Sequence, residues 1–407
     1  MSADPVAHRR GATEVVVRDR SGTPLPHTDV TVRQVRHAFA FGNIGFDLVP
    51  LASGERAAAA DSAFGGAAAN LERLAELWLG LFTTATLPFY WRGFEPTEGA
   101  PQTERLQAAA RWFRERGIAV KGHPLVWHTL APEWLAGRDI PHIERMLRNR
   151  VTRDVTDFAG LVDTWDAINE VVIMPVFDRE ENAITRLAQE KGRVGMVRLA
   201  FEEARAANPA ATLILNDFDL SERYERLIED VLEAGIRPDA IGLQTHMHQG
   251  YWGEERMLAT IDRFARFGIP LHLTESTLLS GDLMPQHIED LNDWQVESWP
   301  STPEGEARQA EEIERHYRSL VGHPAVEAVT YWGLTDDGAW LGAPVGLVRA
   351  DGTTKSSYDA LHALIAGEWW LSPTVMRTDE AGQVTVHGFR GDYEVVVKGD
   401  TQAFAID

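Results

Sequence analysis

The chain has 407 residues, of which 44% are hydrophobic and 25% charged, a composition that allows a globular core of substantial size. Acidic residues outnumber basic ones by 61 to 39, and the formal net charge of -22 disfavours nucleic acid or an anionic membrane as the main partner. The absence of cysteine excludes disulfide bonds and thiolate chemistry. A neutral substrate is compatible with this charge.

The first residues, MSADPVAHRRGATEV, lack the apolar segment of a signal peptide. No stretch approaches the roughly 20 apolar residues that a membrane-spanning helix requires. We therefore expect a cytoplasmic protein without membrane attachment, with the trimmed mature form of a secreted protein as the alternative. The alanine-rich patch Ala57–Ala69 is the only compositionally biased segment.

The predicted elements begin with two strands. Residues 15–35 (VVVRDRSGTPLPHTDVTVRQV) alternate in hydrophobicity around a Ser-Gly and proline-rich turn. Eight further stretches have the length and composition of buried strands, and they lie at Ala38–Asn43, Leu81–Leu87, Ile118–Pro124, Thr164–Glu170, Thr212–Asp217, Ala240–His246, Pro270–Glu275 and Ala328–Gly333. Stretches with a helical period separate several of them, at Glu104–Arg116, His142–Ala159, Gly195–Ala207, Arg223–Ala234 and Glu254–Phe267.

Strands that alternate with helices indicate parallel pairing through right-handed crossovers. Eight such units within residues 37–370 predict the α/β class and a (β/α)8 barrel, also called a TIM barrel. An open doubly wound sheet would usually carry a glycine-rich phosphate turn after its first strand, and this sequence has none.

The chain ends in a second alternating region. Residues 384–399 (VTVHGFRGDYEVVVKG) predict a hairpin with its turn at Arg390, Gly391 and Asp392. We expect the N-terminal β-hairpin extension, residues 1–36, and the C-terminal one, residues 371–407, to pair in a small β-layer against the barrel. This layer would be either a structural cap or an accessory region that binds sugar.

Polar and aromatic residues gather where the predicted strands end, which is the face that carries the active site of a (β/α)8 barrel. Core packing alone would not require such residues there. In chain order they are His123, Trp127, His128, Asn169, Glu170, Asn216, Asp217, Gln244, His246, Thr274, Glu275 and Trp332.

Glu170 and Glu275 end the fourth and seventh barrel strands, which face each other across a barrel. Cleaving a glycosidic bond needs a proton donor for the leaving oxygen and a nucleophile or base on the other face of the sugar. Gln244 and His246 would keep Glu275 ionised as the nucleophile, and repulsion between the two carboxylates would keep Glu170 protonated as the acid. The alternative is that each glutamate only satisfies a structural ion pair.

The remaining polar groups at these ends are assigned to binding and support. We expect Asn169 to bind a sugar hydroxyl, and Asp166, Asn216 and Asp217 to support the carboxylates. The pairs His123/His128 and His246/His248 could suggest a metal. However, their spacing is not that of a metal-binding helix, so we expect hydrogen-bonding roles and neither metal nor cofactor.

Several tryptophans fall in or just beyond the predicted strand ends. Aromatic faces stack well on the CH surfaces of sugars. We therefore expect them to line a carbohydrate cleft, although a single tryptophan is more often part of a core. They are Trp91, Trp127, Trp332 and Trp340.

Six ordered motifs between Phe39 and Ala366 resemble glycoside hydrolase family 10, best known for retaining endo-β-1,4-xylanases on (β/α)8 barrels. They are KGHPLVWH, WDAINE, ILNDFD, IGLQTHMH, LHLTES and TYWGLTDDGAW. The resemblance implies that Glu170 is the acid/base and Glu275 the nucleophile. It also places the following residues at the sugar site: His123, Trp127, Asn169, Gln244, His246 and Trp332.

The sequence departs from the family pattern at two places. After the second barrel strand the family has Glu-Asn-x-x-Lys-Trp, whereas this chain reads TLPFYW, with Thr86, Leu87 and Tyr90 in place of the three polar residues and with Trp91 kept. Thr277 stands where the family has an aspartate that supports the histidine beside the nucleophile. The first change removes hydrogen-bond partners for the glycone, the part of the substrate that carries the attacked carbon.

These departures, with the expected cytoplasmic location, favour a substrate smaller than polymeric xylan. Xylo-oligosaccharides and other β-glycosides are expected, and exo-acting or aglycone-releasing cleavage of an aryl glycoside or a plant saponin is the alternative. A non-catalytic carbohydrate-binding barrel is a third possibility. The sequence leaves open the sugar, the aglycone, hydrolysis against transglycosylation, and the oligomeric state.

Overall fold

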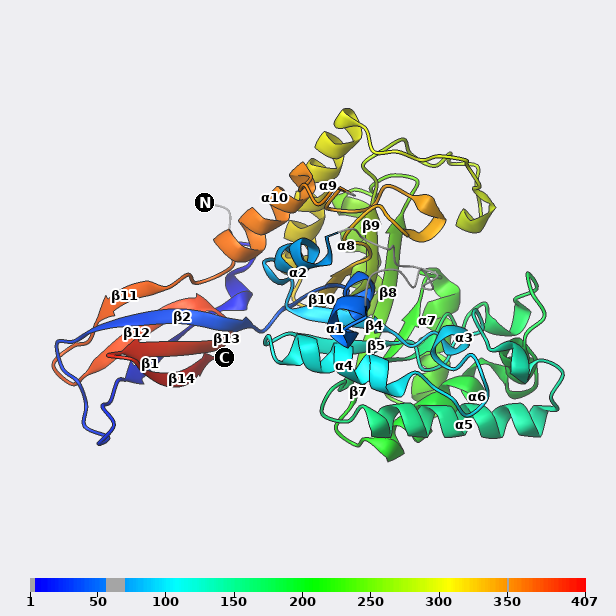
Figure 1. Ribbon diagram of the computed structural model, residues 1–407, viewed down its shortest axis with the longest axis horizontal. Helices are drawn as coiled ribbons and strands as arrows, with labels where there is room; N and C mark the ends of the chain where they lie inside the picture. Colours follow the sequence, from blue (N-terminus) through cyan, green and yellow to red (C-terminus); the bar gives the residue numbers. More distant parts are fainter. Residues whose placement is uncertain (1–3, 56–69, 350) are drawn as a thin grey trace.

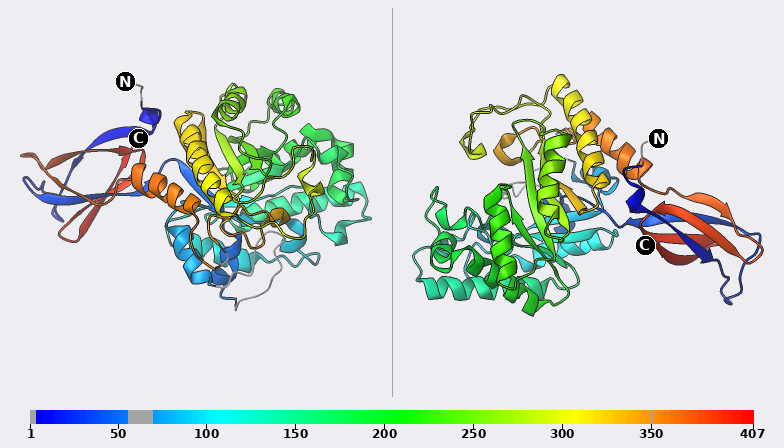
Figure 2. Two further views of the ribbon diagram at one scale, coloured as in Figure 1. Left: turned by 90° about the horizontal axis from the view of Figure 1, so that it is seen from above. Right: turned by 180° about the vertical axis from the view of Figure 1, so that it is seen from behind.

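The computed structural model describes residues 4–55, 70–349 and 351–407, so the alanine-rich patch lies outside the described residues. A helix-covered barrel forms one end of the elongated molecule and a β-sandwich the other (Figure 1). Two further views show the sandwich projecting from one end of the barrel domain (Figure 2).

Eight parallel strands close the barrel in the order β10-β3-β4-β5-β6-β7-β8-β9, which confirms the predicted fold class. Each of the eight predicted strands overlaps one of them. Their bounds are β3 Ala40–Ile44, β4 Thr84–Pro88, β5 Ala119–His123, β6 Thr164–Asn169, β7 Thr212–Asp217, β8 Ala240–Met247, β9 Leu271–Leu278 and β10 Val326–Tyr331. Because all eight strands run the same way, their C-terminal ends meet at one face of the barrel.

Helices cover the outside of the barrel, and polar caps mark where several begin. Side chains of Asp139, Asn182, Ser221 and Thr302 accept hydrogen bonds from the first turns of α5, α6, α7 and α9. The helices are α1 Val49–Ser53, α2 Leu71–Leu79, α3 Trp91–Phe94, α4 Thr103–Arg114, α5 Ile140–Asp157, α6 Ala183–Ala207, α7 Glu222–Glu233, α8 Glu254–Ala265, α9 Pro303–Gly322 and α10 Ser356–His362. In the described part of the chain, no helix is both long and apolar enough to cross a membrane.

One helix begins earlier than the sequence predicts. α6 starts at Ala183 rather than at Gly195, and its path is broken at Gly192, which has φ 68° and ψ 169°. This break interrupts the helical period, because such dihedrals lie outside the helical region. The prediction therefore covered only the second part of the helix.

Strands from both ends of the chain build the sandwich. β1 (Arg10–Val16) pairs antiparallel with β12 (Gln383–Phe389). The other sheet has the order β11-β2-β13-β14, and its strands are β11 Thr374–Arg377, β2 Asp29–His37, β13 Gly391–Val397 and β14 Asp400–Ile406. The terminal segments therefore pair with each other, but β1 does not pair with β2. The hairpin predicted over residues 384–399 is wrong, because β12 and β13 lie in different sheets and β13 pairs with β14 instead. Only Arg390 separates β12 from β13, and Gly391, at φ 146°, begins the strand of the second sheet.

The sandwich attaches where the barrel strands begin. β2 leads directly into β3, and Arg9 donates hydrogen bonds to the carbonyl groups of Val321 and His323 just before β10. The His37 ring packs 5.1 Å from Phe41 of β3 and 5.3 Å from Phe389 of β12. The sandwich therefore lies at the end of the barrel opposite the C-terminal strand ends.

Close packing between β5 and β6 depends on a glycine. A Cβ atom at Gly122 would lie 2.2 Å from the ring of Trp165. Gly122→Ala should therefore lower the free energy of unfolding by about 1–3 kcal/mol or more, because the buried indole must move. Gly93→Ala is the control, since that site is exposed and has no atom within 4 Å of the new carbon. Equal chemical denaturation midpoints for the two variants would contradict this account.

Candidate active site

A cavity of about 640 Å³ opens at the C-terminal ends of the barrel strands. His128 lines it, together with nine of the side chains that the sequence analysis assigned to catalysis or to sugar binding. These are His123, Trp127, Asn169, Glu170, Gln244, His246, Glu275, Trp332 and Trp340. Strand ends far apart in the sequence therefore converge on one site, as the barrel prediction required.

Glu170 stands at the end of β6 in an unusual backbone conformation. Its φ is 58°, in the left-handed region that non-glycine residues seldom adopt, and its N–H donates to the carbonyl of Asn216 at 2.8 Å. The carboxylate accepts hydrogen bonds from Trp127 Nε1 at 2.8 Å, Asn169 Nδ2 at 3.2 Å and Gln244 Nε2 at 3.4 Å. Side chains from three strand ends thus orient this carboxyl group.

Glu275, on β9, lies among nitrogen atoms. His246 Nε2 is 3.1 Å from Oε2, Asn216 Nδ2 donates to Oε1 at 3.0 Å, and His123 Nε2 is 3.9 Å from Oε1. The same amide of Asn216 donates to Asn169 Oδ1 at 2.7 Å. A row of amides therefore links the surroundings of the two glutamates.

The two carboxyl groups have opposite pKa shifts. Burial, helped by the charges of Glu275 and Asp217, raises the pKa of Glu170 to about 8 despite the hydrogen bond from Trp127. Burial alone would also raise the pKa of Glu275. The charge of His123, together with the hydrogen bond and charge of His246, outweighs burial and lowers that pKa below its usual value. Near neutral pH, Glu170 is thus protonated and Glu275 ionised.

A buried charge pair supports His123 from below. Asp166 Oδ2 accepts a hydrogen bond from Lys121 Nζ at 2.8 Å and lies 2.6 Å from His123 Nδ1. Lys121 and His123 lower the pKa of Asp166 although burial opposes them. Asp166 therefore fixes the ring orientation that directs Nε2 of His123 toward Glu275.

Asp217 and Thr277 accept hydrogen bonds from backbone N–H groups near the two glutamates. Asp217 accepts hydrogen bonds from the N–H groups of Val172 and Asp219, at 3.0 and 2.9 Å, and burial raises its pKa to about 7. Thr277 Oγ1 accepts the N–H of Met247 at 3.2 Å and lies 3.4 Å from His246 Nδ1. A neutral hydroxyl thus lies beside that histidine, at the position where the family pattern has an aspartate.

The structure does not place Trp91 where the sequence analysis expected it. Its side chain is 3% exposed and does not line the cavity. The indole N–H donates to Glu95 at 2.9 Å, and the guanidinium of Arg150 lies 4.9 Å from the ring centre. The prediction of a sugar contact was wrong because the short helix α3 turns this ring into the core.

Tyr90, the residue before it, lies in the cavity instead. Its ring is 5.6 Å from His123, 5.5 Å from Trp127 and 5.9 Å from Phe46, and Phe46 is 5.7 Å from Trp332. We call Phe46, Tyr90 and Trp332 the aromatic wall. Beyond it, against Ile44 and Asp47, lies a separate cavity of only about 10 Å³. Tyr90 and Trp332 thus line the main cavity on this side, and Trp332 also lines the small one.

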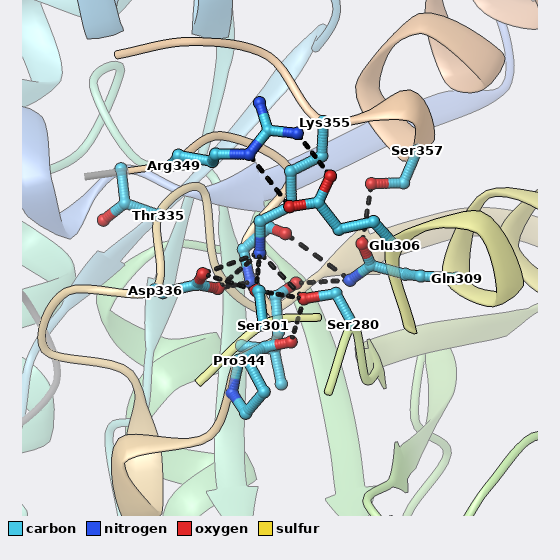
Figure 3. Close-up of polar contacts among 12 residues, drawn as sticks. Ser280, Ser301, Glu306, Gln309, Thr335, Asp336, Pro344, Arg349, Lys355 and Ser357 are labelled. Atoms are coloured by element: carbon cyan, nitrogen blue, oxygen red, sulfur yellow. Dashed lines mark hydrogen bonds and ion pairs between the residues drawn. The ribbon is translucent and has the colours of Figure 1, made fainter. Parts of the chain in front are cut away.

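A buried lysine holds the loops that follow β9 and β10 (Figure 3). Lys355 Nζ donates to both carboxylate oxygens of Asp336 at 2.7 Å, and to the hydroxyl groups of Ser280 at 2.8 Å and Ser301 at 2.9 Å. Asp336 belongs to the same loop as Trp340, which lines the cavity. The sequence analysis missed this cluster, because nothing in the sequence marks Lys355 as buried.

Among residues 4–55, 70–349 and 351–407, no group of three or more His, Asp or Glu side chains is arranged to hold a metal ion. The histidines in the cavity are engaged by other protein groups. His128, for example, packs 4.4 Å from Phe177, and burial lowers its pKa to about 3.

Comparison with known proteins agrees with the fold. The sequence profile of Glycosyl hydrolase family 10 matches residues 82–363, more than half of the chain, and the chain belongs to this family. It is accordingly a xylanase-like glycosidase.

The individual relatives are distant. Endo-1,4-beta-xylanase B of Thermotoga neapolitana is 27% identical over 261 residues, or 62% of this chain and 69% of that protein. The Endo-1,4-beta-xylanase/feruloyl esterase of Xylanibacter ruminicola is 25% identical over 64% of this chain, and the match spans only 39% of that protein. Xylanase 10B from Thermotoga petrophila, solved in complex with xylobiose, superposes with a TM-score of 0.64 at 21% identity, over 81% of this chain and 95% of that one.

The raised pKa of Glu170 should be visible in protein stability. The folded protein keeps the Glu170 proton up to about pH 8, whereas an unfolded chain releases it near 4.5, so this group makes folding less favourable as pH rises from 4.5 to 8. Glu170→Gln should therefore be more stable than the parent at pH 8, by roughly 2–4 kcal/mol. The difference should vanish below pH 4.5.

Urea denaturation at several pH values measures this effect. Glu72→Gln, at an exposed site on α2, is the matched control and should change stability little at any pH. A Glu170→Gln variant that is no more stable than the parent at pH 8 would mean that the Glu170 carboxyl is not buried as described.

Proposed function

We propose that this protein is a retaining β-glycosidase in which Glu275 is the nucleophile and Glu170 the acid/base. In the first step Glu275 attacks the anomeric carbon while Glu170 donates its proton to the leaving oxygen. In the second step the ionised Glu170 removes a proton from a water molecule. The oxygen of that water attacks the anomeric carbon and displaces Glu275, which releases the sugar. The observation that carries this proposal is the opposite pKa shift of two carboxyl groups, one buried (Glu275) and one largely buried (Glu170).

The aromatic wall supports a short glycone. The cavity is lined by the loops after β6, β7 and β9 on one side of the two glutamates and by Tyr90 and Trp332 on the other. A polymer would have to extend past both sides of the cleavage point. Since the relatives are named xylanases, terminal xylosides and short xylo-oligosaccharides are the first substrates to test.

Paired variants test the two roles. Glu275→Gln should abolish turnover of every glycoside. Glu170→Gln should lose about 10²–10⁴-fold on alkyl glycosides, whose leaving oxygen needs a proton, and much less on dinitrophenyl glycosides, whose leaving group needs none. Equal losses on the two substrates would argue against Glu170 as the acid.

The pH dependence of kcat/KM follows from the same pair. Activity requires ionised Glu275 and protonated Glu170, so kcat/KM should fall on the acid side below pH 4.5 and on the alkaline side near pH 8. Initial rates on a nitrophenyl glycoside between pH 3 and 10 measure both limbs. An alkaline limb that is unchanged in Glu170→Gln would assign that ionisation to another group.

Glycone length is tested with nitrophenyl β-xyloside, β-xylobioside, β-glucoside and β-cellobioside beside soluble xylan. The aromatic wall predicts that a single-sugar glycoside is preferred over its two-sugar counterpart and that xylan is untouched. Tyr90→Ala should raise the ratio of xylobioside to xyloside turnover, whereas Phe218→Ala, on the opposite side of the cavity, should not. Strong turnover of xylan by the parent protein would contradict this part of the proposal.

A further inference from the structure

The open side of the cavity has an apolar surface that the proposed reaction does not explain. It is formed by Ile173, Val176, Phe177 and Phe218, which we call the apolar shelf, and all four line the cavity. Val176 is 64% exposed and Phe218 45% exposed. Adjoining exposed apolar side chains in a concave site commonly mark a ligand surface, because isolated ones have no reason to gather there.

The position of the shelf identifies the part of the substrate that lies on it. Ile173, Val176 and Phe177 follow Glu170 in the same loop. Phe177 packs 4.4 Å from His128, whose Nε2 is 3.9 Å from the Glu170 carboxylate. The acid must reach the oxygen of the leaving group. Atoms beyond that oxygen therefore meet the shelf, while the attacked sugar lies toward the aromatic wall.

Arg179, which lines the cavity beside the shelf, is already paired with two aspartates. Arg179 Nε donates to Asp290 at 2.9 Å, and its Nη2 donates to Asp293 at 2.8 Å. These contacts join the loop after β6 to the loop after β9 across the open side of the cavity. The guanidinium is thus occupied, and the four side chains of the shelf themselves offer carbon and no hydrogen-bonding group.

We propose that the apolar shelf binds an apolar leaving group, such as an alkyl chain or fused hydrocarbon rings, in preference to a second sugar. This inference rests on the proposed glycosidase function and specifies the substrate class of that site. The hydroxyl groups of a sugar would lose water without gaining partners over the shelf, whereas hydrocarbon gains by leaving water.

Alkyl β-xylosides with methyl, butyl, hexyl and octyl groups test this directly, with the alkyl β-glucosides in parallel and all below their micelle concentrations. The acidity of the leaving alcohol is nearly constant from butyl to octyl, so the chemical step does not change along that part of the series. We expect kcat/KM to rise about fourfold for each methylene that the shelf covers. A flat series, or a higher kcat/KM for xylobiose than for the octyl xyloside, would overturn the inference.

Two variants locate the effect. Val176→Ser and Phe218→Ser should each lower the ratio of octyl to methyl turnover several-fold. Val375→Ser is the matched control, because Val375 is 70% exposed on β11 of the sandwich, and it should leave the ratio unchanged. An unchanged ratio in both shelf variants would show that the alkyl chain binds elsewhere.

The series also separates this inference from the proposed function. Turnover of the methyl glycosides without a gain from longer chains would contradict the shelf alone and leave the glycosidase mechanism in place. If neither the alkyl series nor the nitrophenyl glycosides are hydrolysed, the proposed function fails, and the inference fails with it.

Discussion

Burial of two carboxyl groups in one site is the constraint on which the rest of the active site depends. Burial opposes the ionisation of both Glu170 and Glu275, and the charge of Glu275 adds to this effect at Glu170, so the surrounding side chains decide which one keeps a proton. Glu275 has His246 and His123 nearby. Glu170 instead accepts hydrogen bonds from the uncharged N–H groups of Trp127, Asn169 and Gln244. This difference assigns the nucleophile and the acid in the proposed mechanism.

The barrel supplies the rigidity that such an asymmetry needs. The amide of Asn216 contacts both Asn169 and Glu275, and the Asp166 pair fixes the ring of His123, so these groups sit on strand ends rather than on loops. The loops add specificity around this fixed centre. Lys355 anchors the loop of Trp340 from beneath, at the other side of the cavity from the apolar shelf.

Much of this could be predicted from the sequence, because buried parallel strands are short apolar runs and because polar residues at their ends have no role in a core. That reasoning located all eight barrel strands and brought Glu170 and Glu275 to one face. The sequence could not show that β1 pairs with β12 in a sheet of their own, because alternating hydrophobicity predicts strands but not their partners.

Other features depend on contacts that leave no periodic signal. The direction of Trp91 is decided by Glu95 and Arg150, and the burial of Lys355 by a carboxylate in another loop. Val176 ends a 3-10 helix of only three residues, Met174–Val176, which is too short for a helical or strand spacing to assign it to the cavity. These are the places where long-range packing, rather than local pattern, determines the structure.

The most direct measurement of the central claim is covalent trapping with an activated 2-deoxy-2-fluoro-β-glycoside of the sugar that the protein prefers. The fluorine slows release of the intermediate, so that peptide mass spectrometry can locate the bound sugar. The account predicts one glycosyl group on Glu275 and none on Glu170. A label on Glu170, or release of the inverted sugar in rapid proton NMR without any labelled peptide, would contradict it.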